Sequence, residues 1–321
     1  MKKIALLALI VPFLFGAAHA AEQYPARPIT FVVPFPPGGA TDLAARTLAR
    51  NLTDHLGATV IVQNKAGASG IVGTQYVANA KPDGYTLLFG ASGTLATNPW
   101  IYKKLPYSEQ SFEPIGAFSE SPLVLALGKH HDFRNLEQLL AYARQHPGDL
   151  NVGSAGPGSA MNLANQLLQQ MTKTKMTDVP FRGSTDGMTA LLSGNIDFMF
   201  DYAVSVAPKV QSGSLAALAT TANKRLHELP DVPTFAELGY PEINLRAWFG
   251  LLVPAGTPRD AVTKLETALQ MTLNDPEFEK AIENQNSVVV KGLTGPAFGD
   301  FIAAERLRWR DLIKAAGVVP Q

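Results

Sequence analysis

The chain has 321 residues, of which 46% are hydrophobic and 17% charged, and this composition is typical of a folded protein. Lys and Arg total 27 against 27 Asp and Glu, a balance that argues against nucleic acid or an anionic membrane surface as partner, because both favour clustered basic residues. Cysteine is absent, which excludes thiol catalysis and cysteine-ligated metals.

The first twenty residues carry the features of a cleavable secretory signal peptide. Met1–Lys3 is a short basic segment, Ile4–Gly16 is almost wholly apolar, and Ala18-His19-Ala20 is a small-x-small cleavage motif. The apolar run is shorter than the roughly 20 residues that a membrane-spanning helix needs. We therefore expect residues 1–20 to be removed and the remaining chain to reside in the periplasm, with an uncleaved anchor as the alternative.

Strands and helices are expected to alternate along the rest of the chain, whose length suggests about two domains. The first helix is expected to be N-capped by Thr41 or Asp42, to place Leu43 on its buried side and to stop near Gly57. A later helix has Thr257 as its expected N-cap. The expected strands are 29–33, 60–62, 85–89, 150–153, 178–181, 196–200, 215–220, 248–253 and 288–290. The expected helices are 41–57, 73–78, 136–144, 159–171, 185–192, 203–211, one from 258 onward, 276–285 and 296–316.

This alternation predicts an α/β protein with parallel strand pairing. The helical tail has too few strands for a sheet of its own, so we expect it to pack back on the first lobe. The chain then crosses between lobes twice, near 115–125 and 243–253. The expected division is a signal peptide at 1–20, a discontinuous first lobe at 21–120 and 246–321, and a second lobe at 121–245. A ligand would lie between the lobes, outside the carboxyl ends of the strands.

The segment Phe35–Asp42 is the most informative candidate site. Consecutive glycines after a strand allow close approach of a ligand, and free N–H groups at the following helix start favour an anion. No Lys follows the glycines, so the segment is not a phosphate loop. A plain strand-to-helix turn with Asp42 as its cap is the alternative. The candidate ligand-binding residues here are Phe35, Gly38, Gly39, Ala40, Thr41 and Asp42.

Two further loops after strands offer hydroxyls and amides. Ser154–Ser159 is rich in glycine and ends in a good N-cap, and Ser92 and Thr94 follow the strand expected at 85–89. Together with Phe35–Asp42 in the first lobe, Ser154–Ser159 in the second lobe would form a clamp. The candidates are Ser92, Thr94, Ser154, Gly158 and Ser159.

Two charged residues are weaker candidates. Arg182 follows a strand and is able to pair with a carboxylate through two hydrogen bonds, with a surface or interlobe position as the alternative. Asp201 would repel an anionic ligand, so capping of the next helix is favoured over ligand contact.

No catalytic or metal site is expected. The histidines lack a second ligand at metal-binding spacing, and His130-His131-Asp132 is predicted to be a solvated turn. No Ser/His/Asp constellation is evident either.

Taken in order along the chain, these motifs resemble the periplasmic substrate-binding receptors of tripartite tricarboxylate transporters, the Bug-type receptors. The matching segments are Val33-Pro34-Phe35 with Gly38-Gly39 and Thr41-Asp42, Pro82-Asp83-Gly84-Tyr85-Thr86, Gly153-Ser154 with Gly156 and Gly158-Ser159, Pro180-Phe181-Arg182-Gly183, Pro230-Asp231-Val232-Pro233-Thr234 and Pro254-Ala255-Gly256-Thr257-Pro258. At Arg182 the family often has Lys, which leaves the role of this position open because the two side chains differ in geometry.

The resemblance implies a two-lobe, type II periplasmic-binding fold that closes on its ligand like a flytrap. It implies a small carboxylate ligand, such as a dicarboxylate or an aromatic acid, held by the loop 35–42 and read at its other end by the loops 92–94 and 154–159. It also implies delivery to membrane permease subunits, and we expect a monomer with no cofactor. A sensory receptor for a membrane kinase is the alternative function, and a secreted hydrolase is a weaker one.

Overall fold

The computed structural model describes residues 24–315, so the expected signal peptide lies outside the described residues. The strands are β1 (Ile29–Val33), β2 (Val60–Asn64), β3 (Thr86–Ala91), β4 (Phe112–Leu127), β5 (Asn151–Ser154), β6 (Thr177–Pro180), β7 (Phe198–Tyr202), β8 (Ala216–Thr220), β9 (Arg246–Pro254) and β10 (Val288–Val289). The α-helices are α1 (Ala40–Leu56), α2 (Ile71–Ala78), α3 (Asn98–Ile101), α4 (Leu136–Gln145), α5 (Ala160–Thr172), α6 (Ser184–Leu192), α7 (Ala203–Gln211), α8 (Arg259–Leu273), α9 (Pro276–Glu283) and α10 (Pro296–Ala315).

One long strand distinguishes the observed fold from the expected one. The segment expected to be a simple crossover is β4, a strand of 16 residues that pairs with β9 antiparallel along the whole length of β9. Its prolines argue against a central strand. The structure accommodates them with register shifts between Pro114 and Gly116 and between Ala117 and Ser119.

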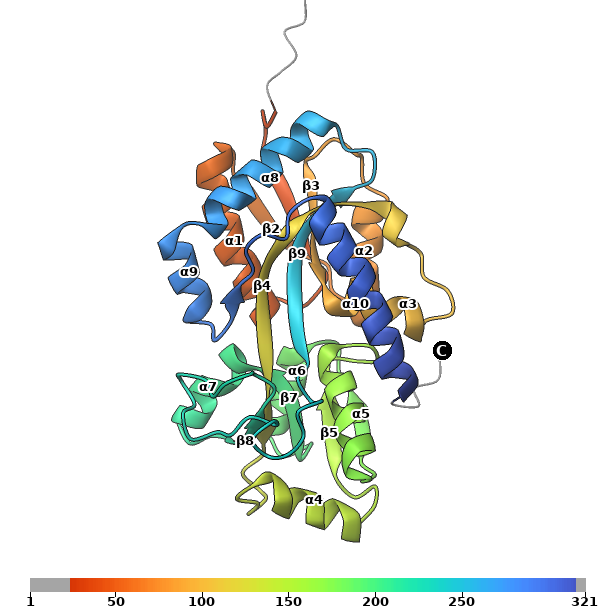
Figure 1. The fold of residues 1–321 in the computed structure, drawn as a ribbon, viewed down its shortest axis with the longest axis vertical. Coiled ribbons are helices and arrows are strands. Elements are labelled where there is room, and N and C mark those ends of the chain that lie inside the picture. Colours follow the sequence, from red (N-terminus) through yellow and green to blue (C-terminus); the bar gives the residue numbers. More distant parts are fainter. Residues whose placement is uncertain (1–23, 316–321) are drawn as a thin grey trace, which may run out of the picture.

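The two long strands join two lobes into one sheet, whose strand order is β2-β1-β3-β9-β4-β7-β5-β6, with β8 and β10 also pairing with β4. We call the part built on β1–β3 and α8–α10 the first lobe, and the part built on β5–β8 and α4–α7 the second lobe (Figure 1). Pairing is parallel among β1, β2 and β3 and among β5, β6 and β7. The expected parallel pairing is thus confirmed within each lobe, whereas pairing is antiparallel wherever β4 or β9 takes part, which was not expected.

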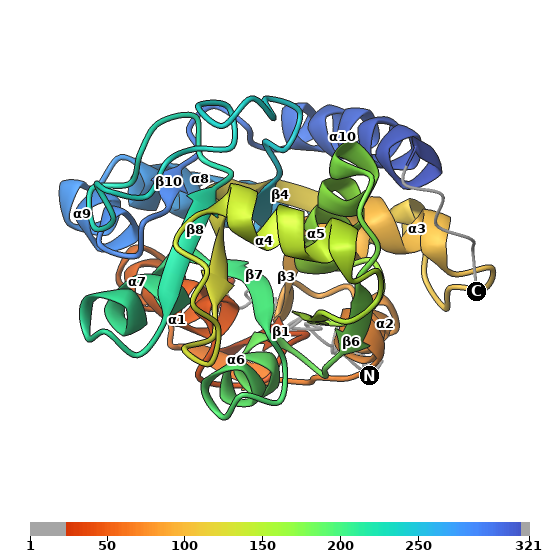
Figure 2. The ribbon, with the colours of Figure 1, turned by 90° about the horizontal axis from the view of Figure 1, so that it is seen from below.

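Helices cover both faces of each lobe. In the first lobe α1 contacts α8 and α9, whereas α10 lies on the other side beside α3 (Figure 1). Viewed from below, α6 and α7 lie on one side of β7, and α5 lies on the other (Figure 2). The carboxyl ends of β1 and β3 therefore face those of β5, β6 and β7 across the space between the lobes.

The helical tail is fixed to the first lobe by buried polar contacts. Trp248 on β9 and Trp309 on α10 both donate from Nε1 to Glu305 Oε2, at 2.9 Å and 3.0 Å. Both indoles are buried, so the hydrogen bonds also satisfy N–H groups that would otherwise be costly to bury. None of the helices between residues 24 and 315 has the length and apolar character that a bilayer crossing requires.

Two local expectations are wrong for identifiable reasons. Leu43 is 44% exposed, because the buried face of α1 follows the smaller Ala44 and Ala45 together with Leu48. Helix α8 starts one residue later than expected, with Pro258 at the N-cap position, since the Thr257 hydroxyl donates back to Pro254 O.

Candidate functional site

A cleft with a volume of about 40 Å³ lies between the lobes, at the carboxyl ends of the parallel strands. This volume holds a few water molecules, so a larger ligand enters only if the lobes or their side chains move apart. The first lobe lines it with Phe35, Pro36, Gly39, Ala40, Thr41, Ser69, Ala91, Ser92 and Gly93. The second lobe lines it with Ala155, Ser159, Ala160, Met161, Ser184, Thr185 and Tyr202.

The first-lobe side of the cleft is the start of α1. Gly39 is the N-cap residue, and no side chain caps the helix, so the expectation that Thr41 or Asp42 is the N-cap is wrong. The first helical hydrogen bond runs from Leu43 N to Gly39 O. Within residues 24–315 nothing accepts a hydrogen bond from the N–H groups of Ala40 and Thr41, both of which line the cleft. These amides, together with the dipole of a 17-residue helix, favour a negative group here.

Asp42 fixes the shape of this loop from behind. Its Oδ2 accepts from Gly38 N at 3.0 Å and from Arg46 Nε at 2.9 Å, and its Oδ1 accepts from Asn64 Nδ2 at 2.9 Å. Burial raises the pKa of Asp42, but these hydrogen bonds outweigh it and leave the pKa below its ordinary value. Gly38 has φ +81°, a conformation that favours glycine. Asp42 and Gly38 therefore position the loop but are not among the residues that line the cleft.

The second lobe presents the start of α5. Ser159 is its N-cap: the Ser159 hydroxyl accepts from Asn162 N at 3.1 Å and donates to Gly156 O at 2.8 Å. Asn162 Oδ1 in turn accepts from Gly158 N at 3.3 Å. Ser159 lines the cleft, whereas Gly158 contacts the first lobe, where its carbonyl accepts from Thr97 Oγ1 at 2.5 Å.

A third helix start faces the cleft from α6. Ser184 and Thr185, its first two residues, both line the cleft, and a Cβ on Gly39 would lie 3.3 Å from Thr185 Oγ1 across the gap between the lobes. Neither residue was predicted from the sequence. The signal was present, because Gly183 follows a strand and precedes a helix in the same manner as Gly39.

Asp201 lies beneath this third helix start. Its carboxylate accepts from Ser184 Oγ at 2.6 Å and from Tyr202 N at 2.7 Å. Asp201 is wholly buried, and burial raises its pKa to about 6. No side chain caps α7, so the expected capping role of Asp201 is wrong. Its observed role is to orient the Ser184 hydroxyl, which lines the cleft.

The remaining candidates are placed as follows. Ser92 lines the cleft, but Thr94 is buried and its hydroxyl donates to Ala91 O. The Ser154 hydroxyl donates to Asp178 Oδ2 at 3.3 Å, and neither Thr94 nor Ser154 is part of the lining. The Arg182 side chain is 84% exposed and pairs with Asp186 at 3.1 Å.

The cleft lining described by the structure therefore contains no charged side chain. Polar character is supplied by hydroxyls, by backbone amides and by three helix starts. A larger groove, about 520 Å³, lies between α10 and the segment 99–114, but its lining belongs to the first lobe and does not include these helix starts.

Two α/β lobes joined by two long strands, with helix starts directed at a cleft between them, define a two-lobed solute-binding protein. Residues 44–318 match the tripartite tricarboxylate transporter family receptor model, and the chain belongs to this receptor family. It is 35% identical to the protein BugT of Bordetella pertussis over an alignment 323 residues long, which covers 99% of each chain.

Two solved structures of similar proteins contain bound acids. The Rhodopseudomonas palustris protein Rpa4515, solved with adipate, is 32% identical with a TM-score of 0.89, over 93% of this chain and 100% of that one. MatC (Rpa3494) of the same organism, with bound malate, is 32% identical with a TM-score of 0.85, over 90% of this chain and 100% of that one. The chain thus has the periplasmic-binding-protein fold, and its function is that of a solute-binding receptor.

Proposed function

We propose that this receptor captures a small carboxylate in the interlobe cleft, with dicarboxylates in the size range of malate and adipate as the first candidates. The observation that carries the proposal is the neutral cleft lining, into which the starts of α1, α5 and α6 converge. A carboxylate placed there would be stabilised by partial positive charges of the backbone and by hydroxyls, without a basic side chain.

The candidate ligand-binding residues have different roles in this proposal. One carboxylate group accepts from the amides of Ala40 and Thr41, and Gly39 keeps the approach to them open. Ser92, Ser159 and Ser184 provide hydroxyls for the rest of the ligand. The apolar side chains of Phe35 and Met161 pack against its carbon chain. Gly38, Asp42, Thr94, Ser154, Gly158 and Asp201 position these groups without contact, and Arg182 has no part in binding.

We infer that the protein carries out no reaction on its ligand. The pair in the cleft that most resembles a nucleophile with its base is Ser184 with Asp201. Asp201 is wholly buried under the helix start. A Ser nucleophile in hydrolases is activated by a base that reaches the reacting atoms. Incubation with small mono- and dicarboxylate esters should therefore give no turnover, and turnover that is abolished by Ser184→Ala would refute this inference.

We also propose that the receptor acts in the periplasm and passes its ligand to membrane permease subunits. Family membership and the signal peptide expected at residues 1–20 support this proposal. Coexpression with the candidate permease of the same genome should restore uptake of the identified acid. Uptake that is equally rapid without this receptor would contradict a role in delivery.

A thermal-shift screen with a matched set of ligands tests the binding proposal. A ligand at about 100 times its Kd adds roughly 2.7 kcal/mol to the free energy of unfolding, which should raise Tm by several degrees. Adipate or malate should give such a shift and the corresponding diamide should not, because the diamide has the same shape without the charge. Equal shifts with acid and diamide would contradict an anion site.

A further inference from the structure

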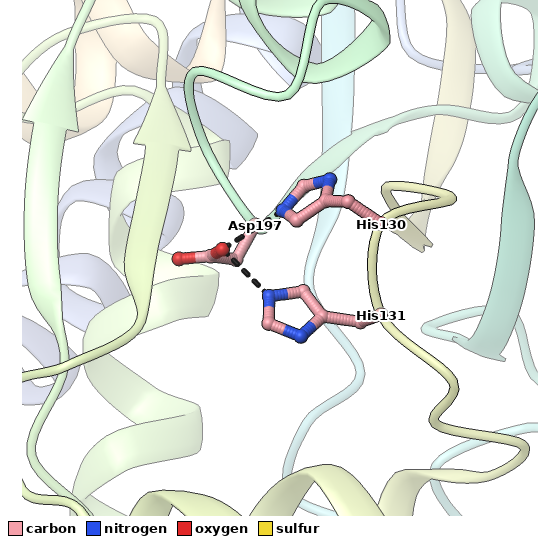
Figure 3. A group of neighbouring side chains, drawn as sticks. All are labelled: His130, His131 and Asp197. Atoms are coloured by element: carbon pink, nitrogen blue, oxygen red, sulfur yellow. Dashed lines mark hydrogen bonds and ion pairs between the residues drawn. The ribbon is translucent and has the colours of Figure 1, made fainter.

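A second cluster of functional groups lies at the outer end of the second lobe. His130 and His131 follow the end of β4, and Asp197 immediately precedes β7, which pairs antiparallel with β4 through Leu127 and Phe198. Both imidazoles point at the same carboxylate (Figure 3). Nε2 of His130 lies 2.9 Å and Nε2 of His131 lies 2.6 Å from Asp197 Oδ1.

The expected turn is present, and His130 and Asp132 are exposed as predicted. The side chain of His131 is only 20% exposed, however, so this histidine is not a simple surface group. The carboxylate partner is Asp197, 66 residues further along the chain, and not the adjacent Asp132. Because strand pairing brings the two segments together, no local spacing rule detects the cluster.

The carboxylate is held in place independently of the histidines. Asp197 Oδ2 accepts from Asn151 N at 2.5 Å, and this bond leaves Oδ1 directed at the two rings. The His131 ring stacks on Phe133 with 4.9 Å between centroids and 10° between planes, which fixes its orientation. Support of this kind around a donor set is typical of metal sites, where hydrogen bonds and packing orient the ligands.

We propose that His130, His131 and Asp197 bind one divalent transition-metal ion, for which Zn²⁺ is the appropriate probe. The three donor atoms lie within 4.8 Å of one another, and two imidazole nitrogens with one carboxylate oxygen suit Zn²⁺. Each ring would carry its proton on Nδ1 and offer the lone pair of Nε2. Tetrahedral bonds of about 2.1 Å place donors roughly 3.4 Å apart, so the rings must move away from the carboxylate by less than about 1 Å.

This ion would cross-link the segment after β4, which carries His130 and His131, to Asp197 at the start of β7. The His130 side chain is 36% exposed, so solvent reaches the cluster and is able to supply the remaining ligand. The site lies at the opposite end of β7 from Tyr202, which lines the cleft, a separation of roughly 16 Å along the strand. Metal binding here is therefore separable from the proposed function.

Zinc titration of the purified, metal-depleted protein without a histidine tag tests the proposal. Isothermal titration calorimetry should show one equivalent of Zn²⁺ bound, and His130→Ala and His131→Ala should each weaken binding at least tenfold. His227→Ala is the matched control, because the His227 side chain is 98% exposed and pairs only with its neighbour Glu228. It should bind Zn²⁺ as the unaltered protein does.

Cobalt provides a second readout that does not depend on the stability of a variant. Co²⁺ bound to the unaltered protein should give the visible absorption of a four- or five-coordinate ion, and Zn²⁺ should displace it with the same stoichiometry. Absence of zinc binding, or retention of full affinity in the His130→Ala/His131→Ala double variant, would overturn the proposal. Cleft ligands should leave the zinc titration unchanged.

Discussion

The loops that begin α1 and α5 look alike in sequence but leave different groups available. Both follow a strand, contain two glycines and start a helix at the cleft. At α5 the Ser159 hydroxyl and the Asn162 side chain already bond backbone N–H groups. At α1 the comparable side chain, Asp42, binds Gly38 N, but no side chain accepts from the amide of Asp42 as Ser159 does from that of Asn162. The two amides before it have no acceptor among the described residues at either helix, those of Ala40 and Thr41 at α1 and those of Ala160 and Met161 at α5.

This difference indicates where the negative charge of a ligand would be held. Unpaired amides at a helix start gain most from an anion, whereas a helix start with a side-chain cap gains less. The first lobe would thus fix the carboxylate, and the second lobe would supply hydroxyls and close over it. Substitutions around the three helix starts test this assignment of roles.

The largest effect is expected at Asp201, beneath the third helix start. Burial raises the pKa of Asp201 from 3.8, the ordinary value expected in the unfolded chain, to about 6 in the folded protein. Folding therefore favours the protonated form of this carboxyl group. The stabilising contribution is complete below pH 3.8 and is lost as pH rises through 6, for a total of about 3 kcal/mol. Relative to Asp201→Asn, the free energy of unfolding in urea should fall by most of this amount between pH 4 and pH 7. Parallel pH profiles for the two proteins would contradict the assigned pKa.

Gly39→Val should weaken carboxylate binding at least 100-fold, or about 2.7 kcal/mol. Gly39 has φ −89°, which valine tolerates, but its side chain would project toward Thr185 where the ligand approaches α1. Calorimetric titration with the acid found by thermal shift measures the loss. Gly299→Ala is the control, since its Cβ would make only an ordinary contact of 3.5 Å with Pro114. Unchanged affinity in Gly39→Val would move the anion site away from the first lobe.

Ser159→Ala removes a side-chain cap and should lower the free energy of unfolding by about 1 kcal/mol. Because Ser159 also lines the cleft, affinity should fall severalfold, far less than in Gly39→Val. Asn135→Ala is a matched control, since Asn135 caps α4 by accepting a hydrogen bond of 3.0 Å from Gln138 N. Asn135 is not among the residues that line the cleft. It should lose similar stability and keep its affinity. If Ser159→Ala lost as much affinity as Gly39→Val, the two loops would contribute equally.

Arg182→Ala should change affinity less than twofold, the smallest effect of the set. The guanidinium is largely exposed and pairs with Asp186 in the first turn of α6, and exposed ion pairs contribute about 0.2–1 kcal/mol to stability. Titration with the same acid measures the change. A tenfold loss would mean that Arg182 folds into the cleft when ligand binds, and that a basic residue shares the anion.

The sequence predicts the parts of this fold that depend on local signals. The buried run at β1, the glycine stop of α1 at Gly57 and the proline starts of α9 and α10 all mark elements correctly. The strand β4 was not predicted, because its prolines and Gly116 resemble a linker. Pairing with β9 along its first part and with β7 and β8 along its second part, all more than 70 residues away in the chain, makes it a strand.

The candidate site was predictable to a similar extent. Glycine-rich loops after strands indicated Gly39, Ala40, Thr41, Ser92 and Ser159, all of which line the cleft, and their contact with a ligand stays a prediction. The same rule applied to Gly183 predicts Ser184 and Thr185. In this segment, however, the candidate was chosen by charge, which gave Arg182. The partners of Asp42 and of His131 are set by tertiary contacts, and no spacing in the sequence reveals them.

The most direct test of the anion site is a crystal structure of the protein with the acid that gives the largest thermal shift. A carboxylate oxygen should lie about 3 Å from the backbone nitrogen of Ala40 or Thr41, inside the cleft and enclosed by the start of α6. A carboxylate bound outside the cleft, or held by a lysine or arginine while both amides face water, would contradict the account.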